Sequence, residues 1–215
     1  MPKKKSSQKF SPLVVERMTL YRRHLEYLES MGRNYIYSHE LARMIGISPA
    51  QLRRDLATFG SFGNIAKGYE VSELKKIIGL LLGTQTINQV ALFGVGNLGR
   101  TLLSYKNFVT RGFLISVCFD IDPHKINRHF AGVPCLPLEK MEEEIIKRDI
   151  KLAIIATVPE GLQELADRLV KAGIRGILNF VPYPIKAPPG VFVEPIDISA
   201  KLEKLSFLYK NAIGS

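Results

Sequence analysis

The segment Gly94-Val95-Gly96-Asn97-Leu98-Gly99 has the composition and spacing to hold a phosphate group. Such a segment acts through its backbone. The first glycine permits a tight turn, the second lets the main chain approach a pyrophosphate, and the third allows close packing of the following helix. Free N–H groups at the start of that helix then face the anion. The spacing predicts a dinucleotide site made mostly of backbone.

A second chemically useful group is the carboxylate of Asp120, 26 residues beyond Gly94. A carboxylate at the end of the second strand can accept hydrogen bonds from ribose hydroxyls, and its charge repels a 2′-phosphate. Asp122 is an alternative for this role, and a capped turn without ligand contact is the structural alternative for the whole Asp120–Pro123 segment. The carboxylates therefore favour NAD(H) over NADP(H).

Apolar strands and amphipathic helices alternate around these residues. Strands are expected at 89–93, 114–119, 152–157 and 176–179, with helices following 97 and at 138–148 and 160–172. This alternation predicts an α/β fold, a Rossmann-like parallel sheet with right-handed crossovers, over residues 84–197.

The nicotinamide is expected beyond the carboxyl ends of the later strands, where ligands of such sheets bind. The residues concerned are Thr157, Val158, Pro159, Asn179 and Phe180. Their mostly apolar character disfavours the positively charged oxidised ring, because burying a charge costs more than burying a neutral group. The site is therefore expected to prefer NADH to NAD.

Residues 1–83 are predicted to form a winged helix-turn-helix domain. Ser38 is expected to cap its second helix, and Ser48 with Gln51 forms a capping box at the start of the third. The outward face of this third helix is predicted to contain Gln51, Arg53, Arg54 and Thr58. These side chains suit phosphate oxygens and the edges of bases in the major groove. The alternative is a small helical domain whose basic face reads no sequence.

The fourth helix and the wing complete this predicted domain. Residues 61–71 are rich in glycine and are expected to form the wing, with Lys67 upon it. Ser72 is expected to cap the fourth helix, which ends near Gly83.

The charge of the chain is concentrated in the same region. Lys and Arg total 30 against 20 Asp and Glu, a formal net charge of +10, and residues 1–83 hold 14 of the basic but only 7 of the acidic side chains. A basic domain of this kind suits a polyanionic partner.

Other composition features narrow the class of protein. Cys118 and Cys135 lack the spacing of metal ligands, which indicates reduced thiols and no metal site. No apolar stretch resembles a membrane span or an export signal, so a cytoplasmic protein without membrane contact is expected.

Several segments occur together in the order that is typical of one family. They are Gln51–Leu56, Phe59–Gly63, Lys67–Tyr69, Gly94–Gly99, Phe119–Pro123 and Ile177–Pro182. Over nearly its whole length the chain resembles the Rex family of redox-sensing transcriptional repressors. It departs from the family pattern in the wing, where Ile65 stands at the position of the usual arginine and Lys67 is the neighbouring cation.

The resemblance implies a homodimer that exchanges its C-terminal helix, residues 198–215, between subunits. It also implies that Arg53 and Arg54 contact operator DNA and that Tyr105 lies near the nicotinamide. The expected protein is a repressor and not an enzyme. It binds palindromic operator DNA and is released by NADH, with NAD competing. Arg23 and Asp197 are the candidates for an ion pair that differs between the two states.

Two other functions fit part of the sequence. One is an NAD-dependent dehydrogenase, which is disfavoured because no substrate domain follows the dinucleotide fold. The other is a module of the same fold that binds a coenzyme A-type nucleotide, which Asp120 disfavours.

Overall fold

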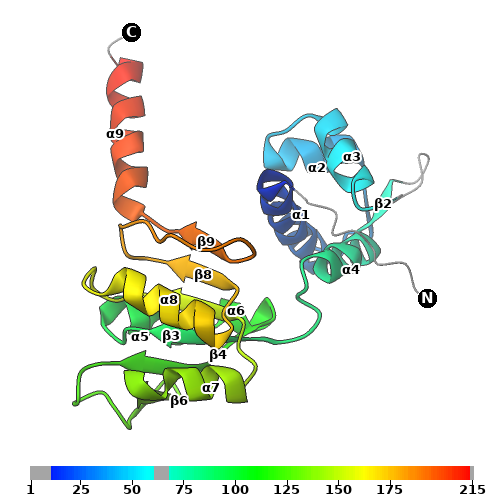
Figure 1. Ribbon diagram of the computed structural model, residues 1–215. Coiled ribbons are helices and arrows are strands. Elements are labelled where there is room, and N and C mark those ends of the chain that lie inside the picture. The colour runs from blue at the N-terminus through cyan, green and yellow to red at the C-terminus, as the bar shows by residue number, and fades with distance from the viewer. Residues whose placement is uncertain (1–10, 61–67, 214–215) are drawn as a thin grey trace. The chain divides into compact units, whose positions relative to one another are not determined.

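The computed structural model describes residues 11–60 and 68–213 (Figure 1). The chain divides into two compact units, Met1–Thr86 and Ile87–Ser215. The predicted wing residue Lys67 lies outside the described residues. Within the described ranges, no helix is long and apolar enough to cross a membrane.

The first unit is a small helical domain with a helix-turn-helix. Its elements are α1 Pro12–Ser30, β1 Tyr35–Ile36, α2 Ser38–Ile45, α3 Pro49–Ala57, β2 Tyr69–Glu70 and α4 Val71–Leu81. Strands β1 and β2 pair antiparallel. All four helices contribute to one apolar core, in which Tyr21, Leu25, Leu41, Leu52 and Ile78 are completely buried. The predicted helix-turn-helix is thereby confirmed.

The helix starts correct some details of the prediction. Ser48 does cap α3, because its hydroxyl accepts a hydrogen bond from the Gln51 N–H at 3.1 Å. Helix α2, however, is capped at Tyr37 and not at Ser38, and the Tyr37 N–H donates to Glu40 three residues on. Helix α4 begins at Val71, one residue before the predicted cap Ser72.

The second unit is a seven-stranded sheet with helices on both faces. Its elements are β3 Asn88–Phe93, α5 Asn97–Leu103, α6 Asn107–Thr110, β4 Phe113–Asp120, β5 His129–Phe130, β6 Val133–Pro137, a 3₁₀ turn Leu138–Lys140, α7 Met141–Lys147, β7 Leu152–Ile155, α8 Leu162–Ala172, β8 Gly176–Asn179, β9 Phe192–Pro195 and α9 Ile198–Ile213. The strand order is β5-β6-β4-β3-β7-β8-β9, and every pairing is parallel except that of β5 with β6. The Rossmann-like fold is confirmed, with β5, β6 and β9 added to the four predicted strands.

The two faces of this sheet are covered by different helices (Figure 1). Because side chains alternate along a strand, Ala91 and Phe93 pack with α7 and α8, whereas Val90 and Leu92 pack toward α5 and α6. Burial on both faces explains why the strands read as continuous apolar runs in the sequence.

Both cysteines lie inside the sheet. Cys118 on β4 lies opposite Cys135 in the register of the neighbouring strand β6, and both thiols are free and fully buried. Burial raises the pKa of each thiol above its ordinary value. They are therefore structural thiols in their protonated form.

Helix α9 leaves its apolar side chains uncovered within this chain. Its side chains from 198 to 212 are all exposed. The large hydrophobic ones are 52–67% exposed: Ile198, Leu202, Leu205, Phe207, Leu208 and Tyr209. An exposed apolar row of this length is typical of a surface that meets another chain.

Candidate dinucleotide cavity and DNA-facing helix

The glycine segment forms the turn from β3 into α5. Gly94 has a φ of +93°, and a Cβ added there would lie 2.4 Å from the carbonyl oxygen of Ala156. A Cβ on Gly99 would lie 2.0 Å from the carbonyl oxygen of Gly94, so α5 lies directly against the turn. Nothing lies within 4 Å of a Cβ placed on Gly96. Gly94 and Gly99 are therefore required by packing, and Gly96 is the position left open to a ligand.

A cavity of about 670 Å³ lies beside this turn, at the carboxyl ends of β3, β4 and β7. Nine of the predicted cofactor residues line it: Gly94, Gly96, Asn97, Leu98, Asp120, Asp122, Thr157, Val158 and Phe180. Five do not contribute to its lining: Val95, Gly99, Tyr105, Pro159 and Asn179. The fold thus brings together the predicted phosphate-binding turn after β3 and the carboxylates after β4.

Asp120 is buried and ties the turn to strand β4. Its carboxylate accepts hydrogen bonds from the N–H groups of Val95 at 2.7 Å and Asp122 at 2.9 Å, and from the Lys125 ammonium at 3.1 Å. Burial would raise the pKa of this carboxyl, but the three donors outweigh burial and lower it. Asp120 is therefore charged at neutral pH, and both its oxygens already have donors.

Asp122 presents the more accessible carboxylate. Its side chain is 37% exposed, against 8% for Asp120. One oxygen accepts from the His124 N–H at 2.9 Å and the other lies 3.5 Å from the Lys125 ammonium. Of the two carboxylates that the sequence offered, Asp122 has the more room for a further hydrogen bond.

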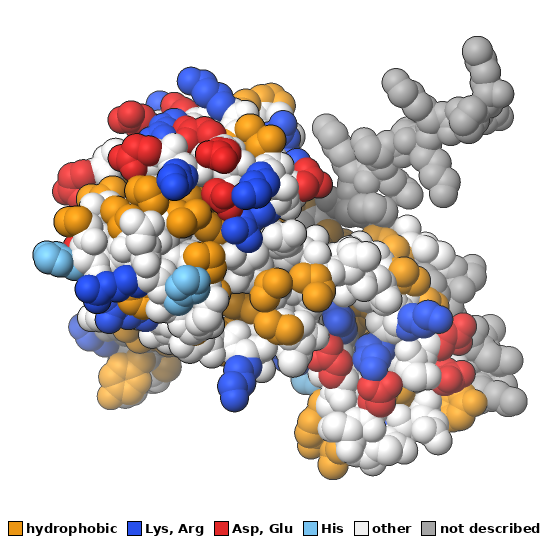
Figure 2. Space-filling view, turned by 90° about the horizontal axis from the view of Figure 1, so that it is seen from below, with side chains coloured by type: hydrophobic (Ala, Val, Ile, Leu, Met, Phe, Trp, Pro, Cys, Tyr) orange, Lys and Arg blue, Asp and Glu red, His pale blue; other side chains and the backbone are white. Residues whose placement is uncertain are grey.

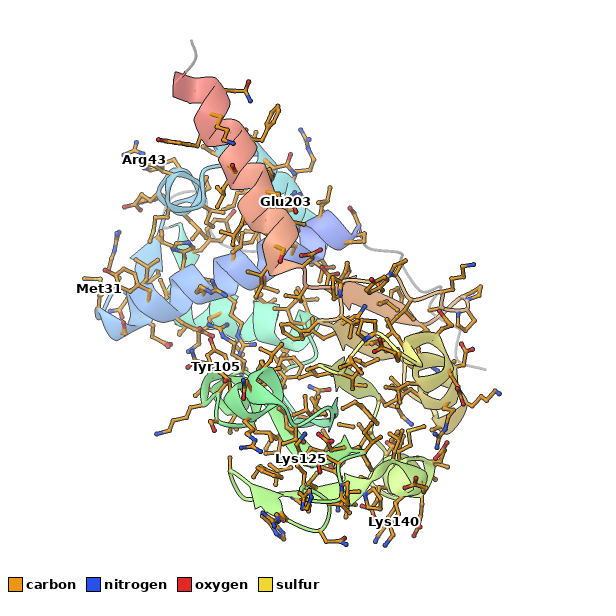
Figure 3. The ribbon with its side chains drawn as sticks, turned by 90° about the vertical axis from the view of Figure 1, so that its left-hand side faces the viewer. Met31, Arg43, Tyr105, Lys125, Lys140 and Glu203 are labelled. Carbon is orange, nitrogen blue, oxygen red and sulfur yellow. The ribbon has the colours of Figure 1, made fainter. Side chains whose placement is uncertain are left out.

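Lys125 is a cavity residue that the sequence interpretation missed. It lies between the two carboxylates and lines the cavity with Ile121, Leu138 and Arg168, which were also missed. The sequence signal that could have indicated Lys125 is its position, five residues after Asp120 and three after Asp122. Figure 3 labels Lys125, in the loop after β4, and Tyr105, in the loop between α5 and α6.

Two of the residues outside the cavity lining have other partners. Asn179 is buried, and its amide accepts from the Val181 N–H and donates to the carbonyl of Tyr183, so it shapes the loop after β8. Tyr105 is half exposed and packs edge-on against Phe108, and its hydroxyl accepts from the Asn107 amide.

Helix α3 exposes two arginines. Arg53 donates to the Ser38 hydroxyl at 3.0 Å, which orients its guanidinium, and Arg54 is exposed beside it. Thr58 is exposed, and its hydroxyl donates to the carbonyl of Arg54. Gln51, which is predicted to face outward, is half-buried, and its amide donates to Asp55 at 2.7 Å.

Surface charge alone does not single out this helix. On the face seen in Figure 2, Lys and Arg side chains are interspersed with Asp and Glu over the described residues. The two predicted switch residues lie in different units: Arg23 is exposed on α1, and Asp197 accepts from the Ala200 N–H at the start of α9. In the described ranges, no group of acidic, histidine or cysteine residues could hold a metal ion.

The two glycines give a matched test of the turn. Gly99→Ala should destabilise the second unit by about 1–3 kcal/mol, because its methyl group would overlap the Gly94 carbonyl. Gly96→Ala should change stability by less than about 0.5 kcal/mol, since its site is open and its φ of −78° suits alanine. Thermal unfolding checks both variants. Equal melting temperatures for Gly99→Ala and the wild type would contradict the close packing of α5.

Comparisons with known proteins agree with this division of the chain. Residues 85–183 match the family model described as CoA binding domain, and residues 9–57 match the model described as putative DNA-binding protein N-terminus. The redox-sensing transcriptional repressor Rex of Desulfitobacterium hafniense is 40% identical over 199 residues, which is 93% of this chain and 95% of that protein.

Solved structures of the same family share the whole fold. The structure of RSP in complex with β-NAD⁺ and operator DNA matches with a TM-score of 0.89 and 32% identity, over 97% of this chain and 99% of that one. The complex of RSP with β-NADH matches with a TM-score of 0.87 and 32% identity, over 96% and 97%. On this identity, coverage and fold, the chain belongs to the Rex family of redox-sensing transcriptional repressors.

Proposed function

We propose that this protein represses transcription by binding operator DNA through α3 and releases the DNA when NADH occupies the cavity of the second unit, with NAD competing. The observation that carries the proposal is the cavity itself, where an open glycine turn and two carboxylates meet at the carboxyl ends of three strands. The complexes of RSP with NADH, and with NAD⁺ and operator DNA, support it.

The residues around the cavity fit the parts of a dinucleotide. The open backbone at Gly96 and the start of α5 would hold the pyrophosphate. Asp122, with Asp120 behind it, would accept hydrogen bonds from the adenine ribose. Thr157, Val158 and Phe180 would lie toward the nicotinamide. The ratio of bound NADH to bound NAD would follow the redox state of the cell, and the cavity residues would discriminate between the reduced and the oxidised dinucleotide.

Charge and polarity then set the preference among nucleotides. The two carboxylates and the single Lys125 leave this corner of the cavity negative, which disfavours the extra ribose phosphate of NADP(H) or coenzyme A. The apolar wall disfavours the cationic ring of NAD relative to the neutral ring of NADH. Both arguments favour NADH as the ligand that triggers release.

The DNA contact is assigned to α3. Arg53 and Arg54 would contact phosphates and base edges in the major groove, with Thr58 at the end of the helix. Lys67, which lies outside the described residues, is the further cation that the sequence predicts to contact DNA. A dimer that presents two such helices binds two half-sites about 34–36 Å apart, so we expect the operator to be palindromic. The protein would act in the cytoplasm, where it meets this DNA.

The second subunit is assigned to the exposed face of α9. Exchange of this helix between two copies would bury Leu202, Leu205, Leu208 and Tyr209. Arg23 and Asp197 would form the ion pair that exists in only one of the two states, and Tyr105 would approach the nicotinamide in the dimer. NADH would act by favouring the state in which the two α3 helices no longer match the half-sites.

The first test is selection of DNA from a pool of random duplexes by the purified protein at fixed salt. A palindrome should be enriched, and NADH should release it at lower concentration than NAD, whereas NADPH and coenzyme A should have little effect. By linkage the enriched DNA should weaken NADH binding by the same factor, roughly 5–150-fold. Enrichment of no sequence, or equal release by NAD and NADH, would overturn the proposal.

Substitution of the two arginines tests the assignment of α3. Arg53→Ala and Arg54→Ala should each weaken binding of the enriched duplex by about 1–3 kcal/mol, since each removes a charged donor to DNA. Lys140→Ala is the control, because it removes one exposed positive charge from the second unit. All three variants should bind NADH as the wild type does. If Lys140→Ala lost as much affinity for the duplex as Arg54→Ala, the net charge of the protein would explain the loss and a specific contact from α3 would not.

The role of α9 can be tested on the oligomeric state. Leu205→Asp should convert a dimer into a monomer at micromolar concentration, because the interface would have to bury an unpaired charge. Lys210→Asp introduces the same side chain five positions further along, about 140° around the helix from Leu205 at 3.6 residues per turn, and should remain dimeric. Sedimentation velocity distinguishes the two. A dimeric Leu205→Asp protein would exclude this face as the interface.

A further inference from the structure

Asp55 is a buried carboxylate on the helix assigned to DNA. It is 2% exposed, and its two oxygens accept four hydrogen bonds. Arg17 donates from Nε at 2.5 Å and from Nη2 at 2.8 Å, Tyr21 donates from its hydroxyl at 2.6 Å, and Gln51 donates from Nε2 at 2.7 Å. Among the described residues, every hydrogen-bond donor to this carboxylate is therefore a side chain.

These donors come from two helices. Arg17 and Tyr21 lie one turn apart on α1, whereas Gln51 precedes Asp55 by one turn on α3 itself. A bidentate arginine–carboxylate pair has a fixed geometry, because two parallel N–H groups must match two oxygens. The Arg17–Asp55 pair therefore defines the angle and rotation of α3 on α1 more narrowly than apolar packing would.

The same carboxylate decides which α3 side chains can reach DNA. A glutamine amide can form two hydrogen bonds with adenine in the major groove. Here the Gln51 amide is held by Asp55, and Gln51 is half-buried. The outward set is thus reduced to Arg53 and Arg54, with Thr58 at the helix end.

We propose that Asp55 is a positioning residue for DNA recognition, which fixes α3 on α1 and keeps Gln51 away from the bases. This inference rests on the proposed function, since it concerns how α3 selects its sequence. Asp55 itself makes no DNA contact. It acts by fixing the orientation of Arg53 and Arg54 and by holding the Gln51 amide in a hydrogen bond away from the DNA.

The proposal predicts that loss of the Asp55 charge weakens specific DNA binding without weakening non-specific DNA binding. Asp55→Asn keeps the shape of the side chain but leaves Arg17 with no opposite charge, so the first unit becomes more positive. Affinity for a scrambled duplex should then stay equal or rise, because that binding depends on net charge. Affinity for the duplex enriched by the wild type should fall at least tenfold. Simple loss of folding would lower both affinities together.

Three further variants complete the experiment. Gln51→Ala should bind the enriched duplex within twofold of the wild type, because the wild-type amide is not available to bases. Tyr21→Phe removes one donor and retains the arginine pair, and should lose specificity less than Asp55→Asn does. Asp167→Asn is the matched control, since Gln163 donates to Asp167 at 2.8 Å in the same spacing on α8 of the second unit. It should leave both affinities unchanged.

The outcomes separate this inference from the proposed function. If the wild type enriches no sequence, the proposed function fails. If the wild type enriches a palindrome but Asp55→Asn retains its preference for that palindrome, or loses both affinities in parallel, the positioning role is wrong. A tenfold loss in Gln51→Ala would show that Gln51 reads bases directly and would also overturn the inference. NADH binding, measured on every variant, reports that the second unit is intact.

Discussion

Among the described glycines, the closest approach to a neighbouring main chain joins helix α5 to the turn before it. No side-chain atom fits between Gly99 and the carbonyl of Gly94, so the start of α5 must lie against the ends of the strands. Asp120 then bonds the N–H of Val95 and joins the turn to β4. The cavity exists because these main-chain segments are held close while Gly96 remains uncovered. Backbone geometry, with few side chains, creates the place for a ligand.

Each unit places a buried carboxylate directly behind the surface proposed here to bind its ligand. Asp120 supports the glycine turn, and Asp55 supports helix α3. Burial would raise the pKa of both groups, but their hydrogen bonds from Arg17, Tyr21 and Gln51 at Asp55, and from backbone and Lys125 at Asp120, lower it instead. Their stabilising effect is thus complete at neutral pH and is lost only when the pH falls through the lowered pKa values. Their neighbours Asp122, Arg53 and Arg54 keep side chains that solvent can reach.

The sequence was sufficient for the long periodic elements and insufficient where side chains from distant segments meet. Four buried strands, the helix-turn-helix and α9 have clear apolar patterns, and they were predicted. Strands β6 and β9 contain prolines, and β5 has two residues, so propensity gave no signal for them. Lys125 and the true orientation of Gln51 depend on tertiary partners at Asp120 and Asp55, which no local pattern records.

The burial of the neighbouring free cysteines Cys118 and Cys135 limits the chemical signals that the protein can receive. Both thiols are enclosed in the sheet and kept protonated, and they are the only cysteines of the chain. Peroxides and disulfides react with thiolates that solvent can reach. A regulator that responds to the nicotinamide ratio would give a mixed output if the same oxidants also modified its own sulfur atoms. Under the proposed function, enclosure of the thiols would keep such oxidants from adding a second signal to the reversible binding of the dinucleotide.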